Sequence, residues 1–338
     1  MALLEVRDLK VHFKIQNGWV KAVDGVSFSI DAGETMGLVG ESGCGKTTAA
    51  YAITQLLPPN GHIKGGKIMY KGSDLLKISI RPDGRLDEFN EDIRKIRWKE
   101  ISMIFQGAMN AFNPVFRVGD QIVEAIQLHE DVDDEKAVER AKALFNFVGI
   151  PEDRITNYPH EFSGGMKQRA MIALALALSP KFIIADEPTT ALDVITQDRI
   201  LFEIRKLQEK LKMAMMIITH DVSVVAEVSD KIAVMYAGRI MEIGKTVQVF
   251  KSTAHPYTSG LLGSFPSIEG ERHRLVSIPG FPPDLVNPPT GCPFHPRCQY
   301  AQQNCSKAVP AGIELEPGHI SYCHYARELQ PKMRRLGS

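Results

Sequence analysis

The sequence contains no long hydrophobic run that could anchor it in a membrane. Its longest uninterrupted apolar stretch, Ala170 to Leu178, is followed by a Ser-Pro pair and is far shorter than the roughly 20 residues that a membrane-spanning helix needs. Residues 5–8 carry charges where a signal peptide would have its apolar region. We therefore expect a chain that does not cross a membrane, is not secreted and lies in the cytosol.

An excess of charge of one sign is also absent. Forty Lys and Arg residues balance 40 Asp and Glu residues, so no global field attracts nucleic acid or an anionic membrane surface. Apolar residues make up 44% of the chain and charged residues 24%, which is ordinary for a soluble globular protein. A chain of 338 residues can bury one large core or two modest ones.

Cysteine is scarce and unevenly placed. Of five cysteines, Cys44 lies in a glycine-rich segment, whereas Cys292, Cys298, Cys305 and Cys323 share one short C-terminal segment. In a reducing compartment such a group is more typical of a metal site than of disulfide bonds.

The glycine-rich segment Gly40–Thr47 matches the phosphate-binding pattern G-x-x-x-x-G-K-T. It lies between a strand predicted at 35–39 and a helix predicted at 47–57, the context that separates a phosphate loop from an ordinary glycine turn. Backbone N–H groups would wrap the phosphates, Lys46 would neutralise the β and γ oxygens, and Thr47 would offer a hydroxyl to Mg²⁺. The residues expected to contact the nucleotide are Gly40, Ser42, Gly43, Cys44, Gly45, Lys46, Thr47 and Thr48. Because Cys44 is near a helix N-terminus, we expect its thiol to have a lowered pKa and to make ATP binding sensitive to thiol reagents.

Two carboxylates end an apolar strand predicted at 182–185. Asp186 is placed to hold the Mg²⁺ shell and Glu187 to orient or deprotonate an attacking water, because phosphoryl transfer depends mainly on positioning and charge neutralisation. A carboxylate pair alone could equally be a solvated strand end. Together with the phosphate loop, it indicates a nucleotide triphosphatase.

Between these two motifs lies Ser163-Gly164-Gly165, just before a helix predicted at 166–178. Ser163 is a natural N-cap, and the glycines expose backbone donors at a positive helix end. On physical grounds the segment is either a simple helix cap or an anion site.

The hydrophobic pattern predicts an α/β protein. Continuous apolar runs at 182–185, 214–218 and 232–236 are typical of a parallel sheet covered on both faces, and residues 2–7 and 26–30 predict an antiparallel layer. Helical spacing at 118–128, 135–148 and 166–178 predicts a helical subdomain over about 107–178. Beyond about residue 250 the chain becomes proline-rich, so we place a boundary there between residues 1–250 and a C-terminal extension, 251–338.

The three motifs, in this order, resemble those of the ATP-binding subunit of an ABC transporter. The resemblance implies that two such domains dimerise head to tail, so that Ser163, Gly164 and Gly165 of one close over the γ-phosphate held by the other. It also implies a Q-loop glutamine at Gln106, a ligand of Mg²⁺ and water that couples hydrolysis to the membrane subunits. The resemblance further implies a D-loop aspartate at Asp193 and a switch histidine at His220. The family stacks an aromatic residue on adenine, for which Phe13 is preferred over Trp19; core packing is the alternative for both.

The extension supplies four thiolates as Cys292-x5-Cys298-x6-Cys305-x17-Cys323. Four thiolates suit a structural Zn²⁺ or an iron–sulfur cluster, and unliganded buried thiols are the remaining alternative. With the segments 255–258 and 287–298, this tail resembles the extension of oligopeptide and dipeptide import ATPases, in which the cysteines are associated with a [4Fe–4S] cluster. The resemblance favours that cluster over Zn²⁺.

The expected fold is therefore a P-loop α/β core with an antiparallel β layer, a helical subdomain and a small metal-binding extension. The expected function is ATP hydrolysis that drives import of di- and oligopeptides through two separate permease subunits. The resemblance implies a position at the cytoplasmic face of the membrane, a second ABC ATPase as partner in a heterodimer or homodimer, and an external peptide-binding protein. The alternative is a soluble ABC-type ATPase acting on nucleic acid or ribosomes, which the balanced charge disfavours. A purely structural metal-binding protein and a non-hydrolysing subunit are further alternatives.

Overall fold

The computed structural model describes residues 2–87, 89–107, 111–188, 194–264 and 278–333. The chain divides into two compact units, one made of residues 1–88 and 219–338 and the other of residues 89–218. The first unit contains the glycine-rich loop and the C-terminal extension. The second contains the helical subdomain and the paired carboxylates.

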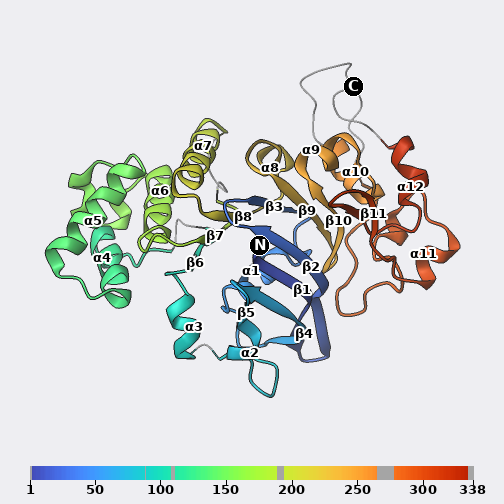
Figure 1. Ribbon diagram of the computed structural model, residues 1–338, viewed down its shortest axis with the longest axis horizontal. Coiled ribbons are helices and arrows are strands. Elements are labelled where there is room, and N and C mark those ends of the chain that lie inside the picture. Colours follow the sequence, from blue (N-terminus) through green and yellow to red (C-terminus); the bar gives the residue numbers. More distant parts are fainter. Residues whose placement is uncertain (1, 88, 108–110, 189–193, 265–277, 334–338) are drawn as a thin grey trace. The chain divides into compact units, whose positions relative to one another are not determined.

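The first unit begins with the predicted antiparallel layer, drawn in blue in Figure 1. Strands β1 (Ala2–Ile15) and β2 (Gly18–Asp31) form a hairpin, and β4 (Gly61–Tyr70) pairs with the other edge of β1 and with the short β5 (Ser73–Asp74). The Asn17-Gly18 turn signal is confirmed, since the two long strands meet there. Helix α2 (Leu75–Ser79) follows β5.

Two buried parallel strands form the centre of this unit. β3 (Thr35–Val39) pairs with β9 (Lys231–Tyr236), and every residue of β3 is buried. Helix α8 (Val222–Val228) packs so closely on β3 that a Cβ at Gly37 would lie 2.1 Å from Val225 Cγ1. The glycine is therefore required by the close approach of helix and strand.

β10 (Arg239–Lys245) returns antiparallel to β9 through a turn in which Ala237 and Gly238 both have positive φ. The strands β12 (His319–Ser321) and β11 (Ile313–Glu316) then continue the sheet from the C-terminal extension. The helices that accompany them are α9 (Thr246–Lys251), α10 (Pro256–Gly263), α11 (Gln303–Lys307) and α12 (Ala326–Leu329). The extension thus adds two strands to the same sheet.

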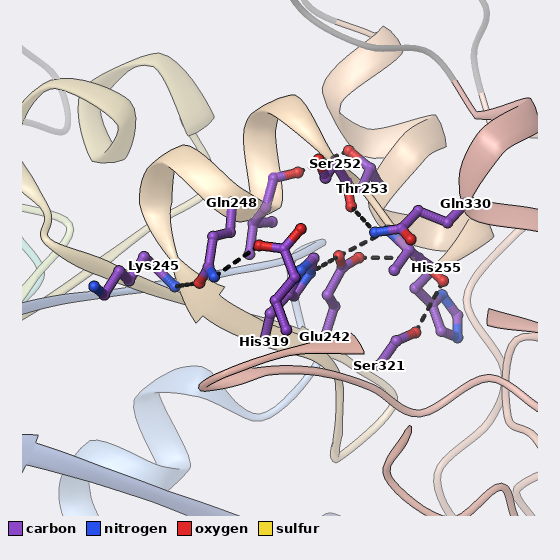
Figure 2. Close-up of polar contacts among 12 residues, drawn as sticks. Glu242, Lys245, Gln248, Ser252, Thr253, His255, His319, Ser321 and Gln330 are labelled. Atoms are coloured by element: carbon purple, nitrogen blue, oxygen red, sulfur yellow. Dashed lines mark hydrogen bonds and ion pairs between the residues drawn. The ribbon is translucent and has the colours of Figure 1, made fainter. Parts of the chain in front are cut away.

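A buried polar network fastens the extension to β10 (Figure 2). Both carboxylate oxygens of Glu242 are used. One accepts from the backbone N–H of Ala254 and from His319 Nε2, each at 2.8 Å, and the other accepts from the N–H of His255 at 3.0 Å. Ser321 adds a bond from its hydroxyl to the Ala254 carbonyl. Since Glu242 and His319 are both 0% exposed, these three bonds compensate the carboxylate for the hydration it lost on burial.

The second unit combines three parallel strands with the predicted helices. β6 (Ile101–Ile104), β7 (Phe182–Asp186) and β8 (Ala214–Thr219) pair in that order. Helices α4 (Val118–His129), α5 (Asp134–Phe147) and α6 (Gly164–Ala175) pack on one another, in green in Figure 1, around the edge-on ring pair Phe145 and Phe162. The remaining helices are α3 (Glu91–Ile96) and α7 (Val194–Leu211). The predicted parallel strands and the three predicted helices are confirmed, with helix ends shifted by up to three residues, whereas the bounds of a helical subdomain at about 107–178 stay a prediction.

Candidate active site

The glycine-rich loop connects β3 to helix α1 (Lys46–Ile53). Gly40 and Gly45 have φ values of 153° and 105°, and a Cβ at either position would lie 2.0 Å from a backbone carbonyl oxygen, that of Met235 or Ala22. No other residue fits in these two places. The loop therefore presents its backbone rather than its side chains. Helix α1 ends earlier than predicted, and Gln55 just beyond it has a φ of 61°.

Lys46 folds back over this loop. Its ammonium group donates to the carbonyls of Gly40 at 2.7 Å and Glu41 at 3.1 Å, and the side chain is largely buried. Thr47 and Thr48 open the first turn of α1 and remain partly exposed, whereas Ser42 and Gly43 are exposed at the tip of the loop. A fixed ammonium group, backbone donors and hydroxyls at a helix N-terminus are the groups that could hold a polyphosphate and Mg²⁺.

The expectation of a lowered pKa for Cys44 is wrong. Burial raises the pKa of the Cys44 thiol, and the nearby Lys46 ammonium only partly offsets this effect. The side chain is 4% exposed. Cys44 does lie near a helix N-terminus, as predicted. However, the loop encloses its sulfur and removes the water that would stabilise a thiolate.

The second unit brings two predicted catalytic residues together. Asp186 ends β7 and is fully buried, and Glu187 follows with a φ of 46°. Glu187 donates its N–H to the Ile218 carbonyl at 2.8 Å, and its carboxylate accepts from Gln106 Nε2 at 2.9 Å. A left-handed conformation at a glutamate is strained, and such strain is typical of functional positions. Gln106, 81 residues away in sequence, is thus in direct contact with the proposed base.

Ser163 is the N-cap of α6, where its hydroxyl accepts from the N–H of Met166 at 3.3 Å. Gly164 and Gly165 form the first helical positions and are partly exposed. The capping role predicted from the sequence is confirmed. A role at the nucleotide of a second subunit stays a prediction.

His220 belongs to the first unit, where it is exposed at the end of β8. The residue after it, Asp221, caps α8. Asp193, predicted for the dimer interface, lies outside the described residues.

The two candidate adenine platforms lie on neighbouring strands. Phe13 on β1 is opposite Val20 and Gly61. Trp19 on β2 makes an edge-on contact with His62 at 4.9 Å and carries the Lys64 ammonium 3.7 Å from its ring centre. The preference for Phe13 stays a prediction.

The four C-terminal cysteines line one small cavity of about 20 Å³, together with Phe294, Tyr300 and Tyr325. Backbone N–H groups point at the sulfurs: those of Phe294 and His295 at Cys292, that of Tyr300 at Cys298 and that of Tyr325 at Cys323. Burial, with a smaller effect of the neighbouring thiols, raises the pKa values of Cys292, Cys298 and Cys323 to about 11. Among the described residues, no three His, Cys, Asp or Glu side chains are placed to hold a metal ion. The convergence of the cysteines is confirmed, and the expected metal site is not.

One conspicuous contact at the loop was missed by the sequence analysis. Arg297 of the extension forms an ion pair with Glu41, the second residue of the glycine-rich loop. The two residues are 256 positions apart, and no sequence periodicity connects them. In the sequence, the one indication of a role for Arg297 is its position directly before Cys298.

Comparison with known proteins identifies relatives of the whole chain. The family described as ABC transporter matches residues 23–190, and the family described as oligopeptide/dipeptide transporter, C-terminal region, matches residues 241–305. The chain is 48% identical over 321 residues to the oligopeptide transport ATP-binding protein OppD of Bacillus subtilis (strain 168), covering 94% of this chain and 87% of that protein. It is 43% identical over 327 residues to the dipeptide transport ATP-binding protein DppD of Escherichia coli (strain K12), covering 96% and 97%.

Solved structures agree on the fold. A dimeric ATP-binding cassette in a post-hydrolysis state, bound to ADP and Pi, matches with a TM-score of 0.62 and 24% identity, covering 72% of this chain and 98% of that one. Within the part of the chain that the structure describes, no helix is long and apolar enough to cross a membrane.

Proposed function

Because the chain belongs to the family of ATP-binding subunits of oligopeptide and dipeptide ABC importers, we propose that it hydrolyses ATP to drive peptide uptake through separate permease subunits. Relatives that align over more than nine-tenths of the chain are named as peptide transport proteins, which favours this function over action on nucleic acid or ribosomes. The observation that carries the chemistry is the glycine loop with Lys46 held across it.

The proposed chemistry divides between positioning and charge neutralisation. Backbone N–H groups of residues 40–47 and the Lys46 ammonium hold the phosphates, while Thr47, Asp186 and Gln106 hold Mg²⁺ directly or through water. Glu187 orients the attacking water and accepts its proton, and the bond from Gln106 fixes the direction of the carboxylate. Mg²⁺, when bound, neutralises charge on the β and γ phosphates. His220 contacts the γ-phosphate.

We propose that the active form is a head-to-tail dimer. The exposed N-terminus of α6, with Ser163 as its cap and two glycines behind it, supplies donors to the γ-phosphate bound by the partner. Asp193 lies at the same interface. The dimer pairs this chain with a related ATPase or with a second copy, at the cytoplasmic face of the membrane, next to two permease subunits supplied by an external peptide-binding protein.

The second part of the proposal assigns a metal centre to the C-terminal extension, residues 251–338, whose boundary with residues 1–250 is proposed from the change in sequence composition. Four cysteines, of which Cys298 is partly exposed and the other three are buried, share a cavity. For three of them the N–H two residues further on points at the sulfur, an arrangement that stabilises thiolate ligands. We propose a [4Fe–4S] cluster in preference to Zn²⁺. Because thiols with raised pKa values must lose their protons, loading releases protons and stabilises the extension.

Both parts are tested on tagged protein purified anaerobically from detergent-solubilised native membranes. Two polytopic permease chains should co-purify, with a second ATPase in the heterodimer, and the complex should release phosphate from ATP. Metal analysis should find about four iron atoms per chain. Recovery with ribosomal proteins or nucleic acid would contradict the importer, and stoichiometric zinc would contradict the cluster without affecting the importer.

A further inference from the structure

Glu41 is held from three directions inside the glycine-rich loop. Its N–H donates to the Tyr257 hydroxyl at 2.9 Å, and its carbonyl accepts from Lys46. Its carboxylate accepts from both terminal nitrogens of Arg297, at 2.7 and 3.0 Å. Two of these three anchors come from the C-terminal extension rather than from the core. The loop is therefore not supported by its own strand and helix alone.

Further hydrogen bonds hold the Arg297 side chain in position for its contact with Glu41. Besides the two-pronged pair with Glu41, its Nε donates to the Pro279 carbonyl at 2.8 Å and Nη1 donates to the Tyr236 hydroxyl at 3.2 Å. The side chain is only 6% exposed. The pKa of Arg297 is raised, and the largest cause is its hydrogen bonding to the Glu41 carboxylate. A largely buried guanidinium that makes four hydrogen bonds holds its partner in one geometry.

Tyr257 holds the backbone of Glu41 in place. It is 0% exposed, and its ring packs 4.6 Å from that of Tyr236 and 5.3 Å from that of Phe294. Burial raises the pKa of Tyr257, so the group next to the loop stays a neutral phenol that can accept from the Glu41 N–H. Phe294 is also part of the lining of the cysteine cavity. A continuous row of packed rings thus connects that cavity to the loop.

The charge of Glu41 makes these contacts functionally important. A carboxylate in a loop that wraps a triphosphate repels the ligand unless a cation neutralises it. The neighbouring glycines add little stiffness, because they restrict the backbone less than any other residue. Arg297 neutralises the charge of the Glu41 carboxylate. Arg297 and Tyr257 together also fix the loop backbone at Glu41.

We propose that Arg297 and Tyr257 of the C-terminal extension are positioning residues for ATP, acting through Glu41 of the phosphate loop. This inference rests on the proposed ATP binding, since it concerns the strength of that binding. It assigns the extension a role in the nucleotide site itself. The extension is then more than an appendage held near the ATPase core.

The test measures the affinity of full-length protein for a fluorescent ATP analogue, with folding monitored by circular dichroism. Arg297→Met leaves the Glu41 charge unbalanced and should weaken binding about tenfold, equivalent to about 1.4 kcal/mol. Adding Glu41→Gln to this variant removes the repulsion and should restore most of the affinity. Tyr257→Phe removes only the acceptor and should weaken binding about threefold.

Gln330→Leu is the matched control, because Gln330 makes a hydrogen bond within the extension, to the Ser252 carbonyl, away from Glu41, and should leave affinity unchanged. Where Arg297→Met fails to fold, Arg297→Lys keeps the charge, loses the two-pronged geometry and should show a smaller loss. Unchanged affinity in the arginine variants, or a double variant as weak as Arg297→Met, would overturn the proposal. Failure of the wild-type protein to bind the analogue would instead contradict the ATPase function.

Discussion

Glu242→Gln should strongly destabilise the first unit, because it affects the centre of the network in Figure 2. The wild-type carboxylate accepts three hydrogen bonds and is 0% exposed. Glutamine keeps one acceptor oxygen and turns an amide nitrogen toward a donor. In the better orientation the amide nitrogen replaces the oxygen that accepts from the N–H of His255, so one bond to a charged acceptor is lost and this buried N–H is left without a partner. At about 1.5 kcal/mol for each effect, the free energy of unfolding should fall by about 3 kcal/mol.

The assay is thermal unfolding of the full-length protein followed by circular dichroism. A loss of about 3 kcal/mol corresponds to a Tm lower by about 6–12 °C for a unit of this size. Glu316→Gln is the matched control: this carboxylate is exposed, accepts from Gln248 at 3.1 Å and lies in the same extension, so its loss should cost less than about 0.5 kcal/mol. A Tm for Glu242→Gln within the range of this control would refute the assignment of the network as the main attachment of the extension.

Three other changes test the site and its surroundings. Glu187→Gln should retain ATP binding and lower phosphate release by about 10²–10⁴-fold, because proton acceptance from water is lost while the phosphate contacts remain; normal turnover would exclude Glu187 as the base. Cys44→Ser should leave the sensitivity of ATP binding to thiol reagents unchanged, since burial raises the pKa of Cys44; a variant made resistant to the reagents would contradict this. Burial lowers the pKa of His255 to about 3, so the unfolded chain binds the proton first as pH falls below about 6.5, and stability should decrease by about 1.4 kcal/mol per pH unit down to about pH 3. His255→Asn keeps an acceptor for the N–H of Tyr257 and should remove this one-proton slope from urea titrations; an unchanged slope would exclude His255 as its source.

Local features of the fold were predictable because local chemistry determines them. The strand at Thr35–Val39 has the predicted ends, since a short, mostly apolar segment is bounded by Glu34 and Gly40. Ser163 is a helix cap for the reason that the sequence gives, a hydroxyl just before a segment with helical spacing of its apolar residues. The contact between Gln106 and Glu187 was not predicted; it arises because they follow the neighbouring parallel strands β6 and β7.

Other features depend on contacts that no local pattern encodes. β4 was missed because Lys64, Gly65 and Gly66 interrupt its apolar alternation, and pairing along β1 overrides that weak propensity. The pKa of Cys44 was predicted in the wrong direction because burial depends on how the loop closes over the sulfur. The metal prediction depended on the number and spacing of cysteines, whereas binding depends on the positions of the sulfurs.

The extension touches the core through two acidic residues with different surroundings, and the difference indicates different roles. Glu242 is fully buried, and its partners are two backbone N–H groups and a histidine, which fits a permanent attachment. The Glu41 side chain is 25% exposed and lies in the phosphate loop, where its partner is a guanidinium one residue before Cys298. If the extension strengthens ATP binding through Glu41, then ATP must stabilise the bound arrangement of Arg297 by the same free energy, because the linkage between two sites is reciprocal. The cysteine cavity shares Phe294 with the rings that pack against Tyr257, so the nucleotide-dependent arrangement of the extension lies in direct contact with the lining of that cavity.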